Sequence, residues 1–225
     1  MTQDGQAEQA GVYERLRRAI LSLELLPGAP VSERALEPLL GASRTPIREA
    51  MLRLTSEGLV QRDGRSHRVA PIDLDELMEA FEYREHIEAA VARILCERPD
   101  PEGMARLQAA LDGGLGDDSP ETWFGIGVDI HTGLARLTGN RFLARAAQDV
   151  ATRISRARWL MVSLPEARAA AHEEHSRILR LIAEVRAEEA VAAVIAHSRA
   201  ARDTLAAAIR QSRNGLRVHG VAVIG

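Results

Sequence analysis

The stretch from residue 32 to residue 60 constrains the fold of this chain more than any other part of its sequence. A helical run ends at Leu40, a Gly-Ala-Ser break follows, and Thr45-Pro46 opens a second helix. Two short helices joined by a tight turn that contains glycine are typical of a helix-turn-helix motif, which binds DNA. The second helix carries arginines at its start and apolar residues behind them, namely Arg44, Arg48, Ile47, Met51, Leu52 and Leu54.

The composition favours a folded, mainly helical protein. Hydrophobic residues make up 46% of the 225 residues, which is enough for a core, and aromatic residues make up only 3%. Abundant Ala, Leu and Arg favour helices over sheets. No apolar run approaches the ~20 residues of a membrane-spanning helix, and the N-terminus lacks the features of a signal peptide. The single cysteine, Cys96, fits a reducing compartment, so we expect a cytoplasmic protein.

Charge is distributed unevenly along the chain. The net charge is −3, which by itself argues weakly against nucleic acid, but residues 11–70 carry ten arginines and seven acids and are therefore net positive. A mildly basic N-terminal segment followed by an acidic remainder is typical of a DNA-binding module attached to another domain. The chain has no lysine, so every basic contact to DNA must come from arginine.

The first part of the chain is predicted to form a disordered tail over residues 1–10 and a winged helix-turn-helix domain over residues 11–71. Apolar residues at helical spacing predict a first amphipathic helix over residues 11–25. After the helix-turn-helix motif, residues 59–61 and 67–70 are predicted to form two short strands around a basic turn, which is a hairpin wing.

From residue 72 onwards we expect helices only, so that residues 72–211 form a six-helix antiparallel bundle. Pro71-Ile72-Asp73 is a natural hinge before the bundle, and residues 212–225 fit no pattern and are left as an unassigned tail. Proline, glycine and short polar breaks separate the expected helices, which span residues 73–97, 101–113, 119–138, 140–162, 165–185 and 187–211.

These motifs resemble a known family over roughly residues 11–210. The segments LLPGAPVSERAL and SRTPIREAMLRLTSEGLV resemble the winged helix-turn-helix of GntR-type bacterial transcriptional regulators. The bundle resembles the FCD effector domain of their FadR/VanR branch, through Arg84 and Glu88 in YREHIEAAVARIL, HTGLARLTGN from residue 131 and EEHSRILRLI from residue 173. The DNA-binding part departs from the family pattern where Glu37 and Pro38 follow the Leu of the first motif helix and where Ser66 replaces a wing glycine. Pro38 is expected to shorten or kink its helix.

The resemblance implies that a set of polar residues contacts DNA bases or phosphates. Ser43 or Thr45 can cap the second motif helix, whose exposed N-terminus favours a phosphate. The wing would approach the minor groove or the backbone through Arg65, His67 and Arg68. The expected DNA-binding residues are Arg34, Ser43, Arg44, Thr45, Arg48, Arg65 and His67. The competing interpretation is that these arginines only solvate the helix and pair with nearby acids.

The resemblance also implies a divalent metal, zinc or nickel, inside the bundle. Many FCD domains hold such an ion with three histidines and an aspartate, and His131, His175 and His197 fall at the matching histidine positions. Gly127 occupies the aspartate's position, and Asp129 lies about 200° around a helix from His131. Three imidazoles can still bind such an ion with open positions for water or a carboxylate effector. The alternative is that the histidines bind the effector without a metal.

Arg84 lies one helical turn before Glu88, and two interpretations of it stay open. Such a pair is often a surface ion pair worth a few tenths of a kcal/mol. In the family, an arginine at this place points into the effector pocket, where it can bind a carboxylate through two hydrogen bonds. With His131, His175 and His197, Arg84 completes the expected effector site.

The sequence thus predicts a ligand-responsive bacterial transcriptional regulator and no enzyme. We expect a repressor that binds a near-palindromic operator as a homodimer and senses a small carboxylate metabolite. One alternative is a DNA-binding protein whose bundle only dimerises. A more remote alternative is a helical-bundle metalloenzyme, but the Glu-x-x-His pairs of di-iron proteins and the HExxH and P-loop motifs are missing.

Overall fold

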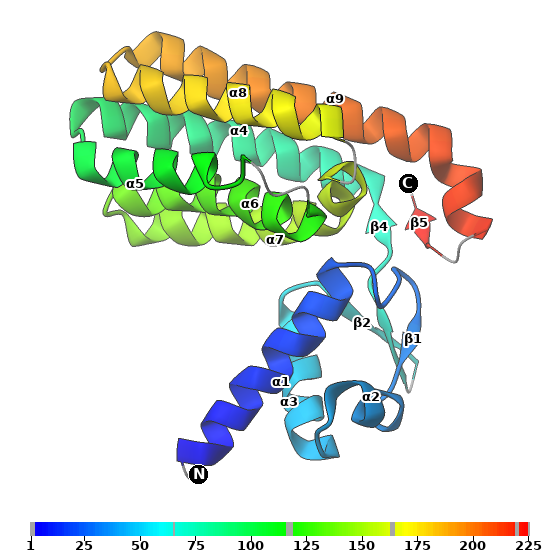
Figure 1. The fold of residues 1–225 in the computed structure, drawn as a ribbon. Coiled ribbons are helices and arrows are strands. Elements are labelled where there is room, and N and C mark those ends of the chain that lie inside the picture. Colours follow the sequence, from blue (N-terminus) through cyan, green and yellow to red (C-terminus); the bar gives the residue numbers. More distant parts are fainter. Residues whose placement is uncertain (1–2, 65, 116–118, 163–164, 219–220, 225) are drawn as a thin grey trace. The chain divides into compact units, whose positions relative to one another are not determined.

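The computed structural model describes residues 3–64, 66–115, 119–162, 165–218 and 221–224. The chain forms two compact units (Figure 1). The first unit contains Met1–Leu74 together with Ile209–Gly225, and the second contains Asp75–Ala208.

The first unit is a helix-turn-helix with a three-stranded sheet. Its elements are α1 (Gln3–Leu21), β1 (Pro30–Val31), α2 (Glu33–Leu40), α3 (Arg44–Ser56), β2 (Val60–Asp63) and β3 (Ser66–Val69). The strands are antiparallel in the order β1-β3-β2, and β2 and β3 form the hairpin wing. Apolar side chains from all three helices and the sheet fill one core, and they include Val12, Leu16, Ile20, Leu36, Ile47, Leu54 and Val69.

Local chemistry fixes the ends of α2. The Ser32 side chain accepts a hydrogen bond of 3.2 Å from the backbone N–H of Ala35, which caps the first turn. Gly41 ends the helix in the left-handed conformation, with φ of 57°. Pro38 lies inside α2, but the helix continues to Leu40. Of the two expected effects, shortening or a kink, the shortening does not occur, because the single N–H that proline lacks is lost near the end of an eight-residue helix whose Leu36 and Leu40 are buried.

Both ends of the chain differ from the prediction. Residues 3–10 are helical, whereas a disordered tail was expected over residues 1–10. Gln, Ala and Glu are good helix formers, and they extend α1 towards the N-terminus. The C-terminal residues 212–225 were left unassigned, but α9 continues to Val218, and Val223–Ile224 form β5.

Strand β5 pairs in parallel with β4 (Ile72–Asp73), in the segment that was expected to be a hinge. The Ile72 N–H donates to the Ala222 carbonyl and the Ala222 N–H donates to the Pro27 carbonyl, both at 2.9 Å. Gly28, with φ of 84°, lies against Ala222 so closely that a Cβ atom on Gly28 would lie 2.4 Å from the Ala222 Cβ. The C-terminal segment is thus packed into the first unit.

The second unit is a bundle of antiparallel helices. Its helices are α4 (Leu74–Glu97), α5 (Pro101–Asp112), α6 (Pro120–Leu137), α7 (Arg141–Val162), α8 (Pro165–Ala183) and α9 (Ala187–Val218). The part of α9 from Ile209 onwards belongs to the first unit. These bounds agree with the predicted spans to within two residues, except at the end of α9.

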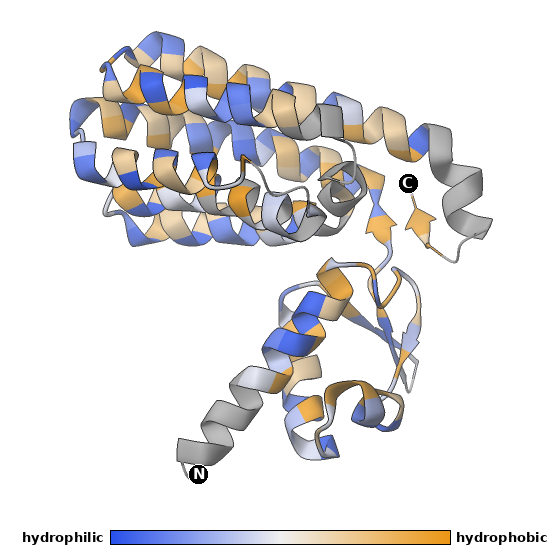
Figure 2. Ribbon diagram, in the orientation of Figure 1, coloured by the Kyte–Doolittle hydropathy of each residue, from blue (hydrophilic) through white to orange (hydrophobic). Residues whose placement is uncertain are grey.

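Each bundle helix carries both hydrophobic and hydrophilic residues, as Figure 2 shows. The largest fully buried side chains of the bundle come from five of its helices and include Phe81, Leu95, Leu111, Ile130, Ile178, Ile182 and Leu205. Within the described part of the chain, no helix has both the length and the hydropathy that a bilayer-spanning helix requires.

The packing of Gly28 against Ala222 predicts that substitution of Gly28 costs more stability than substitution of Gly41. Gly41 also has a positive φ, but a Cβ atom there would meet no atom within 4 Å. Gly41→Ala is expected to cost about 1–2 kcal/mol of unfolding free energy through backbone strain alone. Gly28→Ala should cost more, and the added substitution Ala222→Gly should recover the excess. Denaturant unfolding measures all three, and equal losses for Gly28→Ala and Gly41→Ala would contradict the packing.

Candidate functional site

Helix α3 has a buried side and a strongly polar exposed side. Pro46, Ile47, Ala50, Met51 and Leu54 are buried, so the helix is fixed on the core of the first unit.

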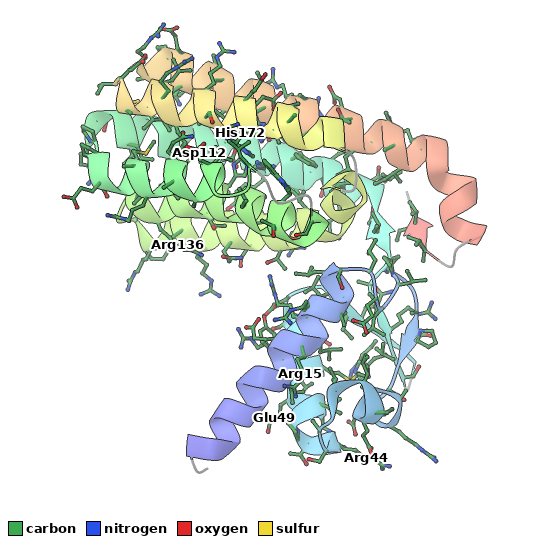
Figure 3. All side chains as sticks on the ribbon, viewed as in Figure 1. Arg15, Arg44, Glu49, Asp112, Arg136 and His172 are labelled. Carbon is green, nitrogen blue, oxygen red and sulfur yellow. The ribbon has the colours of Figure 1, made fainter. Side chains whose placement is uncertain are left out.

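Arg44, Thr45 and Arg48 are exposed, and Arg44 extends away from the body of the unit (Figure 3). Leu52 was expected on the apolar side but lies on the exposed side, 56% accessible, because it follows Arg48 by one turn. Ser43 lies at the N-cap position of α3, but its side chain accepts no capping hydrogen bond from the backbone.

Two glutamates of α2 contact the two arginines of α3. The Arg48 Nε and Nη2 atoms donate to the two carboxylate oxygens of Glu33 at 2.6 and 2.9 Å. The Arg44 Nε atom donates to Glu37 Oε1 at 2.6 Å. The arginines therefore do pair with nearby acids, yet their side chains stay 63% and 60% exposed. Pairing and DNA contact are compatible for these residues.

A polar network holds α3 against α1. The Tyr13 hydroxyl donates to both carboxylate oxygens of Glu57, at 2.7 and 2.9 Å. Burial and the hydrogen bond to Glu57 raise the pKa of Tyr13 to about 12, so the phenol stays neutral and can donate. The Arg53 guanidinium stacks over the Tyr13 ring, 3.6 Å from its centroid. These contacts fix the orientation of the arginine-bearing helix.

The other expected DNA-binding residues lie in α2 and the wing. Arg34 is exposed on α2 and His67 is half-buried on β3. Arg68 pairs with Asp63 across the hairpin. Arg65 lies outside the described residues.

The second unit brings three histidines from three helices together. His131 of α6, His175 of α8 and His197 of α9 are all buried, at 7%, 1% and 8% exposure. One ring nitrogen from each lies within 4.8 Å of the others. The Nε2 atoms of His131 and His175 are 3.0 Å apart. His175 and His197 follow His131 in the sequence by 44 and 66 positions, and the three residues meet because the helices of a bundle face one another.

Carboxylates lie close to the Nδ1 atoms of two of these rings, those of His197 and His131. Glu174 Oε2 lies 2.6 Å from His197 Nδ1, and Glu88 Oε1 lies 2.8 Å from His131 Nδ1, although the second contact lacks the angle of a hydrogen bond. A carboxylate on Nδ1 orients an imidazole so that Nε2 is left as the ligand atom, as in many metal sites. Burial lowers the pKa of His197, which favours the neutral ring that a metal requires.

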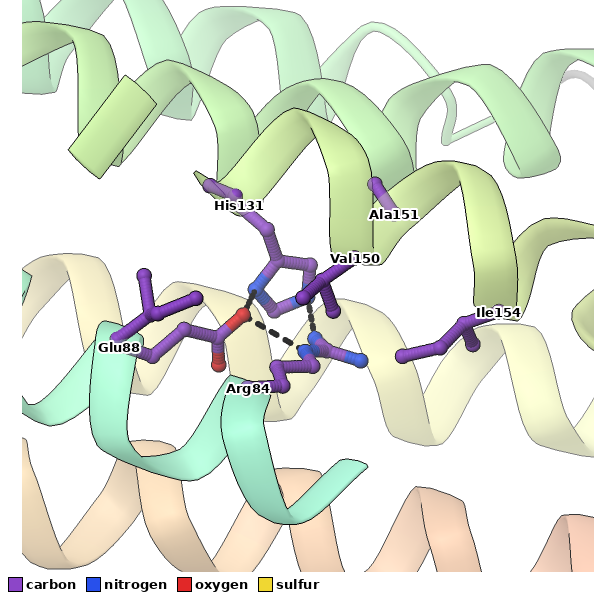
Figure 4. A pocket seen from close by; sticks show the side chains of 8 residues that line it. Arg84, Glu88, His131, Val150, Ala151 and Ile154 are labelled. Atoms are coloured by element: carbon purple, nitrogen blue, oxygen red, sulfur yellow. Dashed lines mark hydrogen bonds and ion pairs between the residues drawn. The ribbon is translucent and has the colours of Figure 1, made fainter. Parts of the chain in front are cut away.

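Arg84 is buried in contact with this cluster. Its Nε atom donates to Glu88 Oε1 at 2.7 Å, and its Nη2 atom contacts His131 Nε2 (Figure 4). Burial, followed by the charge of Arg84, lowers the pKa of His131 to about 3, so the ring is neutral and accepts at Nε2. Burial is the largest single influence on Glu88 and opposes its ionisation, but the charge of Arg84 and the contacts with Arg84 and His131 together outweigh it and hold the pKa of Glu88 well below its usual value. The pair is therefore a buried ion pair and not a surface one.

A small pocket opens beside Arg84. It is lined on one side by Arg84, Glu88 and His131 and on the other by apolar groups that include Val150 and Ile154 (Figure 4). Its volume of about 20 Å³ accommodates one or two water molecules. A larger ligand would have to displace the Arg84 side chain.

Comparison with known protein families now assigns both units. Residues 8–68 match the model of the bacterial regulatory proteins of the gntR family, and residues 79–200, more than half of the chain, match the FCD domain. The chain belongs to the GntR family and carries an FCD domain. It is a DNA-binding transcriptional regulator and not an enzyme.

Known relatives agree with this family. The chain is 29% identical over 180 residues to the Nta operon transcriptional regulator of Aminobacter aminovorans, which covers 79% of this chain and 84% of that protein. It is 35% identical over 139 residues to a helix-turn-helix regulator from an unstable DNA locus of Streptomyces ambofaciens, over 61% of this chain but only 59% of that protein. The structure of McbR/YncC from E. coli shares the fold, with a TM-score of 0.74, 19% identity and coverage of 88% and 97% of the two chains.

The donor set of this GntR regulator fits a divalent transition metal. Three buried imidazoles with carboxylates behind two of them suit zinc or nickel and leave positions open. Gly127, one turn before His131 on α6, has no side chain to contribute, and the side chain of Asp129 lies outside the described residues. Sequence reasoning missed Glu174, although its place beside His175 could have drawn attention to it, and it missed the pairing of Glu33 with Arg48.

The buried pair of Arg84 and Glu88 is expected to contribute strongly to stability. Glu88→Gln would leave the Arg84 charge buried with a neutral partner, and we expect a loss of about 3 kcal/mol of unfolding free energy. Glu102→Gln is the control, because Glu102 also forms an i,i+4 pair, with Arg106, but in the reverse order along the helix and with both side chains exposed, at 92% and 67%. It should change stability by no more than about 0.5 kcal/mol. Similar losses for the two variants in denaturant unfolding would contradict the burial of the Arg84 charge.

Proposed function

We propose that this GntR-family protein is a ligand-responsive repressor that binds a near-palindromic operator as a homodimer in the cytoplasm. Two copies of α3 would enter successive major grooves of the operator. The observation that carries the ligand-responsive part is the buried Arg84, which lies beside three buried histidines. A buried cation that can exchange its partners is suited to bind a small carboxylate.

In this proposal the exposed side of α3 contacts the operator. Arg44 and Arg48 would bind base edges or phosphates. Thr45, Ser43 and the N-terminus of α3 would contact the phosphate backbone of the DNA. Arg34 of α2 would add a phosphate contact, and the wing residues Arg65 and His67 would approach the neighbouring groove. The tight network of α1 and α3 supports this role, because a rigid helix presents its side chains in one orientation.

The effector site would comprise His131, His175, His197 and Arg84. The three histidines would hold a divalent ion such as zinc or nickel, which when bound supplies a Lewis-acidic position for a carboxylate oxygen. Arg84 would leave His131 and donate to the same carboxylate. Glu88 and Glu174 would keep the His131 and His197 rings oriented through their Nδ1 atoms.

The chain path suggests how the two units are coupled. Strand β4 runs directly into α4, which carries Arg84 and Glu88. Helix α9 carries His197 and leads to β5, which pairs with β4. A ligand that moves α4 relative to α9 would therefore strain or relax the β4–β5 pair. The resulting coupling free energy between ligand and operator is typically 1–3 kcal/mol.

A second candidate function is a regulator whose bundle only dimerises. The small volume of the pocket and the satisfied contacts of Arg84 favour it. The two candidates differ in one measurable respect, because only the first predicts that a bound carboxylate changes operator affinity.

Arg48→Ala tests the DNA-binding surface. We expect this substitution to cost about 1–3 kcal/mol of operator binding free energy, since the side chain lies on the exposed side of α3. Fluorescence anisotropy with a duplex selected by the wild-type protein from randomised DNA measures the effect. Arg106→Ala, an exposed arginine of the bundle, is the control and should bind like wild type. Unchanged operator affinity for Arg48→Ala would contradict the assignment.

His175→Ala tests the metal site. Protein loaded with zinc or nickel and then dialysed should retain near-stoichiometric metal by elemental analysis, and His175→Ala should lose it. His172→Ala is a matched control on the same helix, because His172 contacts Asp112 and lies outside the three-histidine cluster. Metal retained by His175→Ala, or lost equally by both variants, would contradict the site.

Deletion of residues 221–225 tests the coupling path. This deletion removes β5 and its hydrogen bonds to β4 and Pro27. Operator affinity and carboxylate affinity should each stay close to wild type, whereas the effect of the carboxylate on operator affinity should disappear. A deletion variant that responds to the carboxylate as wild type does would show that β5 takes no part in the coupling.

A further inference from the structure

The recognition arginines of α3 are held by acids of α2 in a regular arrangement. Glu33 and Glu37 lie one turn apart on α2, and their partners Arg48 and Arg44 lie one turn apart on α3. Glu33 binds Arg48 through two parallel hydrogen bonds of 2.6 and 2.9 Å, whereas Glu37 binds Arg44 through one of 2.6 Å. Glu33 is the less exposed of the two acids, at 28% against 37%.

Folding alone does not account for these pairs. The arginines are more than half exposed, and exposed ion pairs contribute little to stability. The hydrogen bond from Arg48 lowers the pKa of Glu33, so the carboxylate is ionised at neutral pH. An ionised acid on a surface that meets DNA repels phosphate. A negative charge at Glu33 stabilises the first turn of α2, but this does not explain why both acids pair with arginines of α3, for which DNA binding supplies a reason.

The geometry of the Arg48 contact supplies that reason. A guanidinium has five N–H donors in a rigid plane, and Glu33 takes one on Nε and one on Nη2. The donors that are left lie on Nη1 and Nη2, on the edge that faces away from Glu33. Guanine needs two donors for its O6 and N7 acceptors. Arg48 can therefore contact a guanine edge while it stays bound to Glu33.

We propose that Glu33 is a positioning residue that orients Arg48 for guanine recognition, and that Glu33 and Glu37 together weaken binding to non-cognate DNA. Orientation by Glu33 lowers the entropy that Arg48 loses on binding a guanine. The two negative charges offset the arginines when only phosphates are in reach. This inference rests on the proposed function, because it needs α3 to contact the operator.

The test compares cognate and random DNA for Glu33→Gln, Glu37→Gln and Glu14→Gln. Glu14→Gln is the matched control: it makes the same change in charge and shape at an exposed position of α1, in the same unit. Wild type selects its preferred duplex from a pool with a randomised core, and Arg48→Ala identifies the base pair whose preference depends on Arg48. Affinities for the selected duplex and for a random-sequence duplex are then measured over a series of salt concentrations.

Glu33→Gln should bind the random duplex several-fold more tightly and lose the preference for guanine at the Arg48-dependent position. Its plot of log affinity against log salt should be steeper by about one ion, because the freed guanidinium can contact a phosphate. Glu37→Gln should bind both duplexes more tightly. Glu14→Gln should keep the wild-type ratio of the two affinities.

The proposal is overturned if Glu33→Gln keeps the wild-type ratio and base preference, as Glu14→Gln does, or if the Arg48-dependent base is not guanine. Circular dichroism and thermal unfolding of each variant exclude a folding defect as the cause of a changed ratio. A wild-type protein that enriches no duplex would instead refute the proposed function, and the inference with it. The two failures are therefore distinguishable.

Discussion

The buried charge of Arg84 is the constraint on which the centre of the bundle depends. A guanidinium at 6% exposure is stable only with a compensating charge and with acceptors for its N–H groups. Glu88, one turn along α4, supplies the charge, and His131 of α6 supplies an acceptor. The acceptor role requires a neutral His131, which is also the form that can bind a metal. The ion pair with Glu88 and the contact with His131 thus both follow from one buried cation.

Solvent exposure distinguishes the ion pairs of Arg44 and Arg48 in the first unit from the ion pair of Arg84 in the bundle. Arg44 and Arg48 pair with acids in solvent, where each pair contributes little to stability. Arg84 pairs with Glu88 away from solvent, where an exchange requires a ligand of equal charge. In these ion pairs the fork of arginine donors fits a carboxylate, and the same fork also fits phosphates and guanine edges.

Sequence reasoning predicted the elements better than the contacts between them. The Gly-Ala-Ser break and Thr45-Pro46 predict the end of α2 and the start of α3, since they act locally. The bundle helices follow from proline and glycine breaks for the same reason. The pairing of Glu33 with Arg48 joins residues 15 positions apart across a turn, and no local pattern encodes it. The end of α9 and strand β5 were missed because β5 has only two residues and forms through its pairing with β4. Glu174 was missed because its partner is His197 of the next helix and not its neighbour His175.

The central claim is that ligand binding among the histidines and Arg84 is linked to operator binding. The most direct measurement is calorimetry of metal-loaded wild type with a panel of small mono-, di- and tricarboxylates, with and without the selected operator duplex, beside operator titrations with and without each carboxylate. Linkage requires that a carboxylate change operator affinity by the same factor as the operator changes carboxylate affinity, on the order of 5–150-fold. We predict equal factors in both directions for at least one carboxylate. A carboxylate that binds the bundle while both affinities stay unchanged would contradict the account.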